Sequence, residues 1–193
     1  MIELLQEENT KNRATIKVLG VGGAGCNAVN SSIESGYQGI EYIVANTDIQ
    51  ALEASKALHK IQIGIKSTKG LGSGTDPELG KRAAEEDLDK ILEVIGDADI
   101  VFLTAGMGGG TGSGSMPVIA RALKEHGILT IAIVTKPFLF EGKRRSRVAE
   151  AALETLKKEI DTLIVIPNQK LLEVVDANAS MIDAFAKINE VLS

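Results

Sequence analysis

Short runs of apolar residues along the chain alternate with segments whose apolar residues recur at helical spacing. Most runs are unbroken and β-branched, which is typical of strands buried on both faces of a parallel sheet. The predicted strands are Ile16–Val21, Ile40–Ala45, Ile61–Ile63, Ile100–Leu103, Leu129–Val134 and Thr162–Ile166. The predicted helices between them are Ala24–Ser35, Pro77–Ile95, Gly112–His126 and Arg144–Glu159. This alternation predicts an α/β fold with a doubly wound, mostly parallel sheet and helices on both faces.

The two ends of the chain differ from this alternation. Residues 1–14 are polar and charged without a sustained period, which predicts a flexible arm. Four apolar residues between Met181 and Leu192 form a helical stripe that is still in progress where the sequence stops. We therefore expect one domain over residues 15–178, followed over residues 179–193 by the start of a helix that continues in a longer protein.

Composition narrows the class of protein. Of the 193 residues 44% are hydrophobic but only 3% aromatic, so the core is expected to be aliphatic. The net charge of −5 and the scattered basic residues argue against a nucleic-acid surface. The single cysteine, Cys26, excludes an internal disulfide and fits a reducing cytosol. No run has the length of a membrane span and no signal core is visible, so we expect a cytoplasmic protein without direct membrane insertion.

A glycine turn follows the first predicted strand, and we call residues 20–25 the first glycine loop. Gly20, Gly22 and Gly25 fit the pattern G-x-G-x-x-G, which places a pyrophosphate at a helix N-terminus. Asp48 follows at about the distance of the acidic residue that binds ribose in dinucleotide sites. Taken alone, these residues favour NAD and a dehydrogenase.

The second glycine loop, residues 106–114, holds six glycines in nine positions between a predicted strand and a predicted helix. Converging backbone N–H groups at a helix N-terminus form an anion site that suits phosphate, and Thr111 and Ser113 add hydroxyl donors. A flexible linker is the alternative, but it does not fit a segment held directly between strand and helix. Two such loops, after the first and fourth predicted strands, suit a phosphate chain longer than a pyrophosphate. No P-loop sequence with its phosphate-binding lysine occurs.

A third glycine loop, residues 70–74, precedes the predicted helix at Pro77. By itself it is best interpreted as an ordinary surface turn.

Taken together, these segments resemble the FtsZ family of bacterial tubulin-like cell-division GTPases. The resemblance runs from Ile16 to Ser193, with the motifs in family order. Its segments are GVGGAGCNAVN at 20–30, ANTDIQAL at 45–52, TKGLGSGTDPELG at 68–80, GGGTGSG (the tubulin signature) at 108–114, TKPFLFEGKRR at 135–145 and IPNQKLL at 166–172. The resemblance implies that residues 15–178 form a Rossmann-like GTP-binding domain and that residues 179–193 begin the helix that leads to a missing second domain.

The resemblance also implies a set of site residues. Glu141 and Arg145 are implied to reach the ribose and its phosphates, and Asn168, Phe185 and Asn189 to hold guanine. The full implied GTP-binding set is Gly22, Gly23, Ala24, Gly25, Cys26, Asn27, Asn46, Thr47, Asp48, Gly72, Gly74, Gly106, Gly108, Gly109, Gly110, Thr111, Gly112, Ser113, Pro137, Glu141, Arg145, Asn168, Phe185 and Asn189.

Several of these residues have a simpler interpretation. Glu141 and Arg145 are four apart and can form a helical ion pair. Asn168 can cap a helix. Phe185 can pack in the core, because it belongs to the apolar stripe near the C-terminus.

Some positions depart from the family's usual residues: Cys26, Ser73, Thr75, Asp76 and Gln169. Cys26 is expected to put a soft side chain near the phosphates, and the changes in the third glycine loop bear on its sensing of a γ-phosphate. None of them removes a backbone N–H donor, so nucleotide binding is expected to persist.

Catalysis in the family uses an acidic N-x-D-x-x-D loop, which follows the helix at which this sequence stops. The resemblance implies that this loop is supplied in trans by the next subunit of a filament, so no catalytic residue and no protein metal site are expected within the chain. The implied ligands are GTP or GDP, with Mg²⁺ accompanying the triphosphate. The implied partners are further copies, head to tail, and division-site proteins bound through missing C-terminal parts, at the mid-cell ring.

Two other hypotheses stay open at this point. One is an NAD-dependent dehydrogenase built on the first glycine loop. The other is an assembly module that binds a nucleotide without turning it over.

Overall fold

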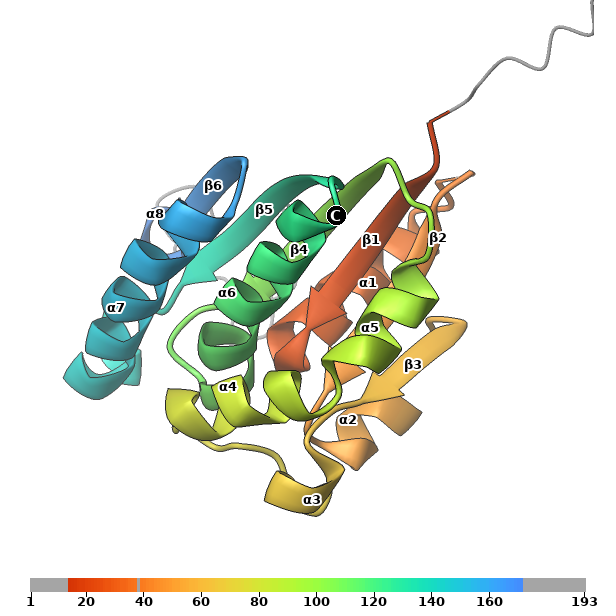
Figure 1. Cartoon of the computed structure of the whole chain (residues 1–193). Helices are drawn as coiled ribbons and strands as arrows, with labels where there is room; N and C mark the ends of the chain where they lie inside the picture. Colours follow the sequence, from red (N-terminus) through yellow and green to blue (C-terminus); the bar gives the residue numbers. More distant parts are fainter. Residues whose placement is uncertain (1–13, 38, 172–193) are drawn as a thin grey trace, which may run out of the picture.

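The computed structural model describes residues 14–37 and 39–171, with six parallel strands at the centre (Figure 1). The strand order is β3-β2-β1-β4-β5-β6. Strands β2 and β3 are therefore added on one side of β1, and β4, β5 and β6 on its other side. The strands are β1 (Ile16–Val21), β2 (Glu41–Asn46), β3 (His59–Gln62), β4 (Ile100–Gly106), β5 (Leu129–Lys136) and β6 (Thr162–Pro167). The predicted doubly wound α/β fold is confirmed, and the described strand pairs are all parallel.

Helices cover both faces of the sheet. The four helices α4 to α7 lie on one face and α1 lies on the other (Figure 1). The helices are α1 (Gly22–Glu34), α2 (Ile49–Glu53), α3 (Ile65–Thr68), α4 (Pro77–Glu86), α5 (Leu88–Ile95), α6 (Gly110–Glu125), α7 (Lys143–Glu159) and α8 (Asn168–Leu171), with a short 3-10 helix η1 (Leu139–Glu141). None of the described helices is long and apolar enough to span a bilayer.

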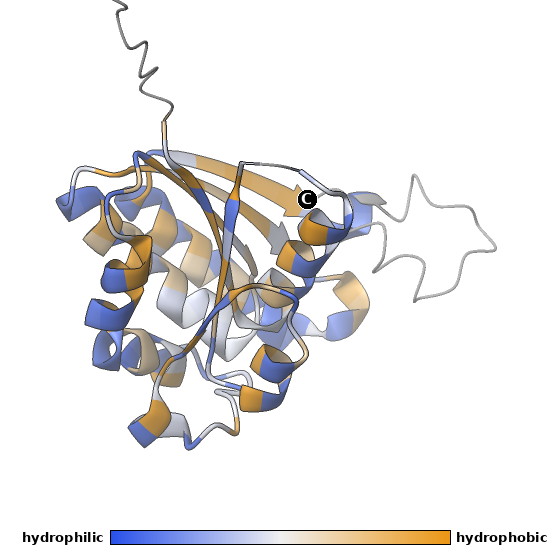
Figure 2. Ribbon diagram, turned by 90° about the vertical axis from the view of Figure 1, so that its right-hand side faces the viewer, coloured by the Kyte–Doolittle hydropathy of each residue, from blue (hydrophilic) through white to orange (hydrophobic). Residues whose placement is uncertain are grey.

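The core is aliphatic, as the composition predicts. Leu19, Ile43 and Leu103 of three adjacent strands are fully buried and pack in one cluster with Met116 and Ile119 of α6. Figure 2 shows the strands mostly in the hydrophobic colour, between helices whose outward faces are hydrophilic. Removing this apolar surface from water is the main term that stabilises the layered arrangement.

The helix predicted over Pro77–Ile95 is two helices, and the prediction of one continuous helix is wrong. Asp87 separates α4 from α5 with a non-helical backbone (φ −121°, ψ 22°). Its carboxylate accepts a hydrogen bond from the Gly64 N–H at 2.7 Å and pairs with Lys90. A buried side chain that binds a distant backbone group therefore interrupts a pattern that is helical throughout.

The ends of several elements also differ from the prediction. Strands β4 and β5 run on to Gly106 and Lys136, because Gly106 pairs in register with Thr135. Helices α2 and α3 were not predicted, since four or five residues are too few to show a helical period. The predicted arm, except Ala14, and the predicted final helix lie outside the described residues.

Candidate functional site

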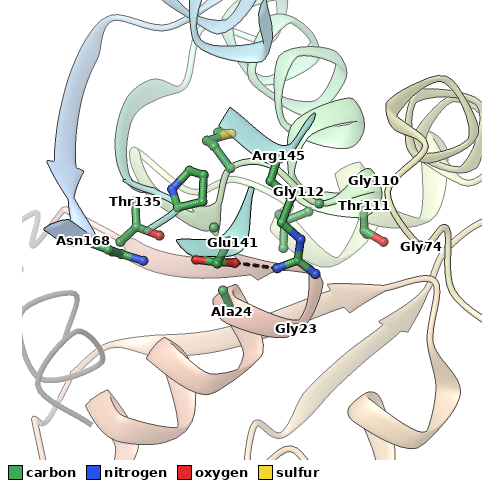
Figure 3. Close-up of a pocket in the computed structure, with 16 residues that line it drawn as sticks. Gly23, Ala24, Gly74, Gly110, Thr111, Gly112, Thr135, Glu141, Arg145 and Asn168 are labelled. Atoms are coloured by element: carbon green, nitrogen blue, oxygen red, sulfur yellow. Dashed lines mark hydrogen bonds and ion pairs between the residues drawn. The ribbon is translucent and has the colours of Figure 1, made fainter. Parts of the chain in front are cut away.

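The carboxyl ends of β1 and β4 meet at the middle of one edge of the sheet. Helix α1 leaves β1 towards one face and α6 leaves β4 towards the other, and a crevice at such a switch point is where open α/β sheets bind ligands. A cavity of about 290 Å³ lies there (Figure 3). It is lined by Val21, Gly22, Gly23, Ala24, Gly74, Gly106, Met107, Gly109, Gly110, Thr111, Gly112, Thr135, Pro137, Glu141, Arg145 and Asn168.

The first glycine loop brings the N-terminus of α1 to this cavity. A Cβ at Gly25 would lie 2.6 Å from the Thr104 carbonyl oxygen and 2.8 Å from the Gly20 carbonyl carbon. Only glycine permits this close contact between helix and strand, which is the packing role of the last glycine in the G-x-G-x-x-G pattern. Gly22 at the helix start has φ +73°, a left-handed conformation that glycine adopts readily.

The second glycine loop brings the N-terminus of α6 to the same cavity. Gly108 has φ +105°, and its N–H donates to Ser113 Oγ at 2.8 Å, which closes the loop onto the helix. Neither α1 nor α6 has a side-chain cap at its N-terminus. Two long helices therefore direct the positive ends of their dipoles at one cavity, an arrangement that favours an anion.

The third glycine loop is part of the site, not an isolated surface turn. The Gly110 N–H donates to the Gly74 carbonyl oxygen at 2.8 Å, and Ser73 Oγ lies 2.7 Å from Thr111 Oγ1. These contacts hold the loop against the start of α6. Gly74 lines the cavity, whereas the Gly72 N–H donates to the Thr47 carbonyl oxygen at 3.2 Å.

Glu141 and Arg145 lie next to one another in the cavity wall, with their side chains directed toward each other (Figure 3). Arg145 Nη1 donates to Glu141 Oε2 at 2.5 Å, so the ion pair expected from their spacing is present. The other carboxylate oxygen accepts from the Phe138 N–H at 2.9 Å, which anchors Glu141 on η1. The pair is therefore both a local contact and part of the cavity wall.

Asn168 stands at the start of α8 and lines the cavity from the β6 side (Figure 3). Its residue exposure is 6%, and its buried Oδ1 accepts no hydrogen bond within the described part of the chain. Asn168 Oδ1 therefore does not cap helix α8 through a hydrogen bond to any described N–H group. A buried amide oxygen without a donor is costly, and a ligand that donates a hydrogen bond to it would remove that cost.

Some predicted residues lie beside the cavity and do not line it. They are Gly25, Cys26, Asn27, Asn46, Thr47, Asp48, Gly72, Gly108 and Ser113. Several of them support the loops: Asn46 Oδ1, for example, accepts from the Thr47 N–H at 2.8 Å. Phe185 and Asn189 lie outside the described residues, so their predicted role stays a prediction.

The Cys26 side chain is buried in α1, and its Sγ lies 3.7 Å from Asn46 Nδ2. Burial raises the pKa of the thiol to about 11, so it stays protonated at neutral pH. The expectation that this side chain reaches the phosphate region is not met, because it is directed into the protein and not into the cavity.

Asp48 caps α2 through one carboxylate oxygen, which accepts from the N–H groups of Gln50 at 2.9 Å and Ala51 at 3.3 Å. Its carboxylate is absent from the cavity wall. The residue that suggested ribose binding in a dinucleotide site therefore serves a local structural purpose, which weakens the dehydrogenase hypothesis.

Three residues that line the cavity were not predicted: Val21, Met107 and Thr135. Thr135 is 3% exposed and lies opposite Gly106 in the sheet. The signal that could have found it is its position at the carboxyl end of a strand, but the apolar run that marked this strand stops at Val134.

The described residues contain no group of three or more His, Cys, Asp and Glu side chains that could hold a metal ion. Mg²⁺ is commonly held by substrate phosphates and water with few protein ligands, so it does not require such a group.

Comparisons with known proteins agree with this geometry. A sequence model of the Tubulin/FtsZ family GTPase domain matches residues 15–176. The chain is 52% identical over 191 residues to the cell division protein FtsZ of Bartonella bacilliformis, which covers 99% of this chain and 32% of that protein.

Solved structures show the same similarity. An empty FtsZ dimer from M. jannaschii matches with a TM-score of 0.90 and 47% identity, covering 95% of this chain and 53% of that one. CetZ2 from Haloferax volcanii, in a GTPγS-bound protofilament, matches with a TM-score of 0.83 and 26% identity over 92% of this chain and 55% of that one. The chain thus spans about a third of the curated relative and about half of the solved chains. With its fold, its glycine loops and these matches in agreement, the chain belongs to the Tubulin/FtsZ family.

Proposed function

We propose that this chain is the GTP-binding domain of a filament-forming GTPase of bacterial cell division. The observation that carries the proposal is the convergence of two uncapped helix N-termini and three glycine loops on one cavity. Such a cavity suits a chain of phosphates better than the single pyrophosphate of a dinucleotide. Asn168 supports guanine as the base, because its Oδ1, which has no hydrogen-bond partner among the described residues, can accept from the N1–H of guanine, a donor that adenine lacks.

Each part of the cavity has a proposed role. The three glycine loops hold the phosphates, Glu141 and Arg145 bind the ribose and its phosphates, and Asn168 reads the base together with Phe185 and Asn189. Mg²⁺ accompanies the triphosphate and neutralises part of its charge.

Hydrolysis needs a group that polarises water, and we propose that a neighbouring subunit supplies it. Among the described residues that line the cavity, Glu141 is the only carboxylate. Both of its oxygens are engaged, one by Arg145 and the other by the Phe138 N–H, so it is not free to act as a base. Carboxylates brought by the next copy in a filament would complete the site.

The proposed assembly is a head-to-tail filament in the cytoplasm, at the ring where the cell divides. Support comes from the relatives: a cell division protein by name, an FtsZ dimer, and a CetZ2 protofilament with GTPγS bound. Division-site proteins are proposed to bind parts of the whole protein beyond this chain.

Competition binding tests the proposal. A labelled GDP bound to the 193-residue chain should be displaced by GTP and GDP at concentrations at least about 100-fold below those of ATP and NAD, because adenine lacks the N1–H that would pair with Asn168 Oδ1. The variant Asn168→Ala should lose this preference, and Gln169→Ala, on the same helix but not on the cavity wall, should keep it. Equal affinity for ATP would contradict the guanine assignment, and a preference for NAD would favour a dehydrogenase.

A further inference from the structure

Two buried hydroxyl groups lie within hydrogen-bonding distance of a third, which belongs to the second glycine loop. Thr111 Oγ1 lies 2.7 Å from Thr47 Oγ1 and 2.7 Å from Ser73 Oγ. Thr47 directly follows β2, Ser73 belongs to the third glycine loop and Thr111 lies at the start of α6. The exposed fractions of these residues are 0%, 5% and 9%, respectively. We call them the hydroxyl cluster. Within it, only Thr111 lines the cavity.

The number of protons in the cluster limits how it can be arranged. A hydroxyl donates one hydrogen bond and accepts up to two. If Thr111 donates to either neighbour, it has no proton left for a ligand. If Thr47 and Ser73 both donate to Thr111, its oxygen is saturated and its single proton is directed into the cavity. A phosphate oxygen there selects this second arrangement, because hydrogen bonds to a charged acceptor are about twice as strong as neutral ones.

We propose that Ser73 and Thr47 are positioning residues that orient the Thr111 hydroxyl as a donor to a bound phosphate. This inference rests on the proposed function, since it requires a phosphate in the cavity. The two donated hydrogen bonds fix the rotamer of Thr111 and polarise its O–H bond. Because Ser73 belongs to the third glycine loop, phosphate binding and the attachment of this loop to α6 stabilise one another.

Ser73 is one of the positions at which the sequence departs from the family pattern, and the proposal gives its hydroxyl a function. The loop is also attached to α6 by the hydrogen bond from the Gly110 N–H to the Gly74 carbonyl oxygen. Removal of the Ser73 hydroxyl therefore leaves the loop in place and deletes one donor to Thr111. The two effects, attachment and orientation, can be separated by experiment.

Calorimetric titration of the 193-residue chain with GDP and with inorganic pyrophosphate provides the test. We expect Ser73→Ala to weaken both ligands about three- to tenfold, the size of one lost hydrogen bond. The matched control is Ser115→Ala, which removes another buried α6 hydroxyl, bonded to the Gly80 carbonyl oxygen at 2.9 Å and absent from the cavity wall. This control should lose a similar amount of stability and keep its affinity.

A double-mutant cycle separates positioning from general damage. In a Thr111→Val background, Ser73→Ala should have no further effect on affinity, because the hydroxyl that it orients is gone. Thr47→Val, which is close to threonine in volume, replaces Ser73→Ala in this cycle if that variant folds poorly, and it too should have no further effect in the Thr111→Val background. Thr47→Ser keeps the hydroxyl and should retain affinity. The phosphorus NMR signal of bound pyrophosphate should shift in Ser73→Ala and stay in place in Ser115→Ala.

The possible outcomes are distinguishable. Equal loss of affinity in Ser73→Ala and Ser115→Ala, or additive effects with Thr111→Val, would overturn the positioning role and leave the proposed function intact. If the parent chain bound pyrophosphate but showed no guanine preference, the proposed function would fail and the positioning role would still be measurable. Failure of the parent chain to bind either ligand would overturn both.

Discussion

Individual glycines of the second loop differ in what they face, and this decides what a substitution there reports. A Cβ at Gly110 would lie 2.6 Å from both the Asp76 carbonyl oxygen and Ser73 Oγ. A Cβ at Gly109 would meet only the Gly74 carbonyl oxygen, at 4.0 Å, and its backbone φ of −89° is open to any residue. Gly109 is therefore the position at which an added methyl group enters the cavity without disturbing the protein.

Gly109→Ala is expected to weaken nucleotide binding at least about tenfold, or about 1.4 kcal/mol, because the methyl group occupies space that a phosphate needs. Calorimetric titration measures the affinity, and circular dichroism should show an unchanged melting temperature. Gly110→Val is the contrasting variant and should lose stability as well as affinity, since it has no room for a side chain. Full affinity in Gly109→Ala would mean that the loop is only a turn.

At the scale of elements, the break between α4 and α5 depends on one carboxylate. Burial alone would raise the pKa of Asp87, but the hydrogen bonds from Lys90 and the Gly64 N–H outweigh burial and lower it below its ordinary value. The carboxylate therefore stabilises the folded state in its charged form. This contribution is complete above the ordinary pKa of 3.8 and is lost as the pH falls through the lowered folded value.

Asp87→Ala should lower the free energy of unfolding by about 1–3 kcal/mol at pH 7, because the Gly64 N–H loses its buried acceptor. Urea unfolding at a series of pH values measures this loss, which should shrink as the pH drops below 3.8. Asp89→Ala, an exposed substitution two residues further along α5, is the control and should change stability by less than about 0.5 kcal/mol. A loss that is the same at all pH values would show that the charge of Asp87 does not matter.

At the scale of the whole molecule, the described wall of the cavity offers groups that bind phosphate but no free carboxylate that could polarise water. Its wall supplies backbone N–H groups, hydroxyls and one ion pair, and its only carboxylate among the described lining residues is already engaged. Binding energy alone does not accelerate hydrolysis unless some group acts more strongly on the transition state than on bound GTP.

The 193-residue chain at high dilution is therefore expected to bind GTP and to release phosphate at close to the background rate. Addition of a full-length family member whose own nucleotide site is disabled should restore turnover, if the two surfaces can meet. Phosphate release measured against chain concentration checks both expectations. Rapid release by the dilute chain would contradict a site completed in trans, and no release with any partner would favour a nucleotide-binding assembly module.

Local pattern was sufficient for most of the architecture. Apolar runs, most of them unbroken and β-branched, predict the places of all six strands, because a strand buried on both faces leaves no polar alternation; the run at Ile61–Ile63 overlaps β3 by two residues. The two glycine loops at strand ends predicted where the cavity lies, since parallel strands bring their carboxyl ends to one edge. These features can be predicted from the sequence because each depends on residues that are close together in the chain.

Which of these residues come into contact depends on the tertiary structure. The interruption at Asp87 depends on the Gly64 N–H, 23 positions away, and the hydroxyl cluster joins Thr47 to Thr111 across 64 positions. That Asn168 Oδ1 has no hydrogen-bond partner among the described residues is likewise a property of its surroundings and not of its neighbours in sequence. The elements and the chemistry of the loops can be inferred from the amino-acid sequence, because periodicity and glycine content act locally. Strand order and packing decided how side chains far apart in the chain combine into one site, because hydrogen bonds form only between atoms that the fold has brought together.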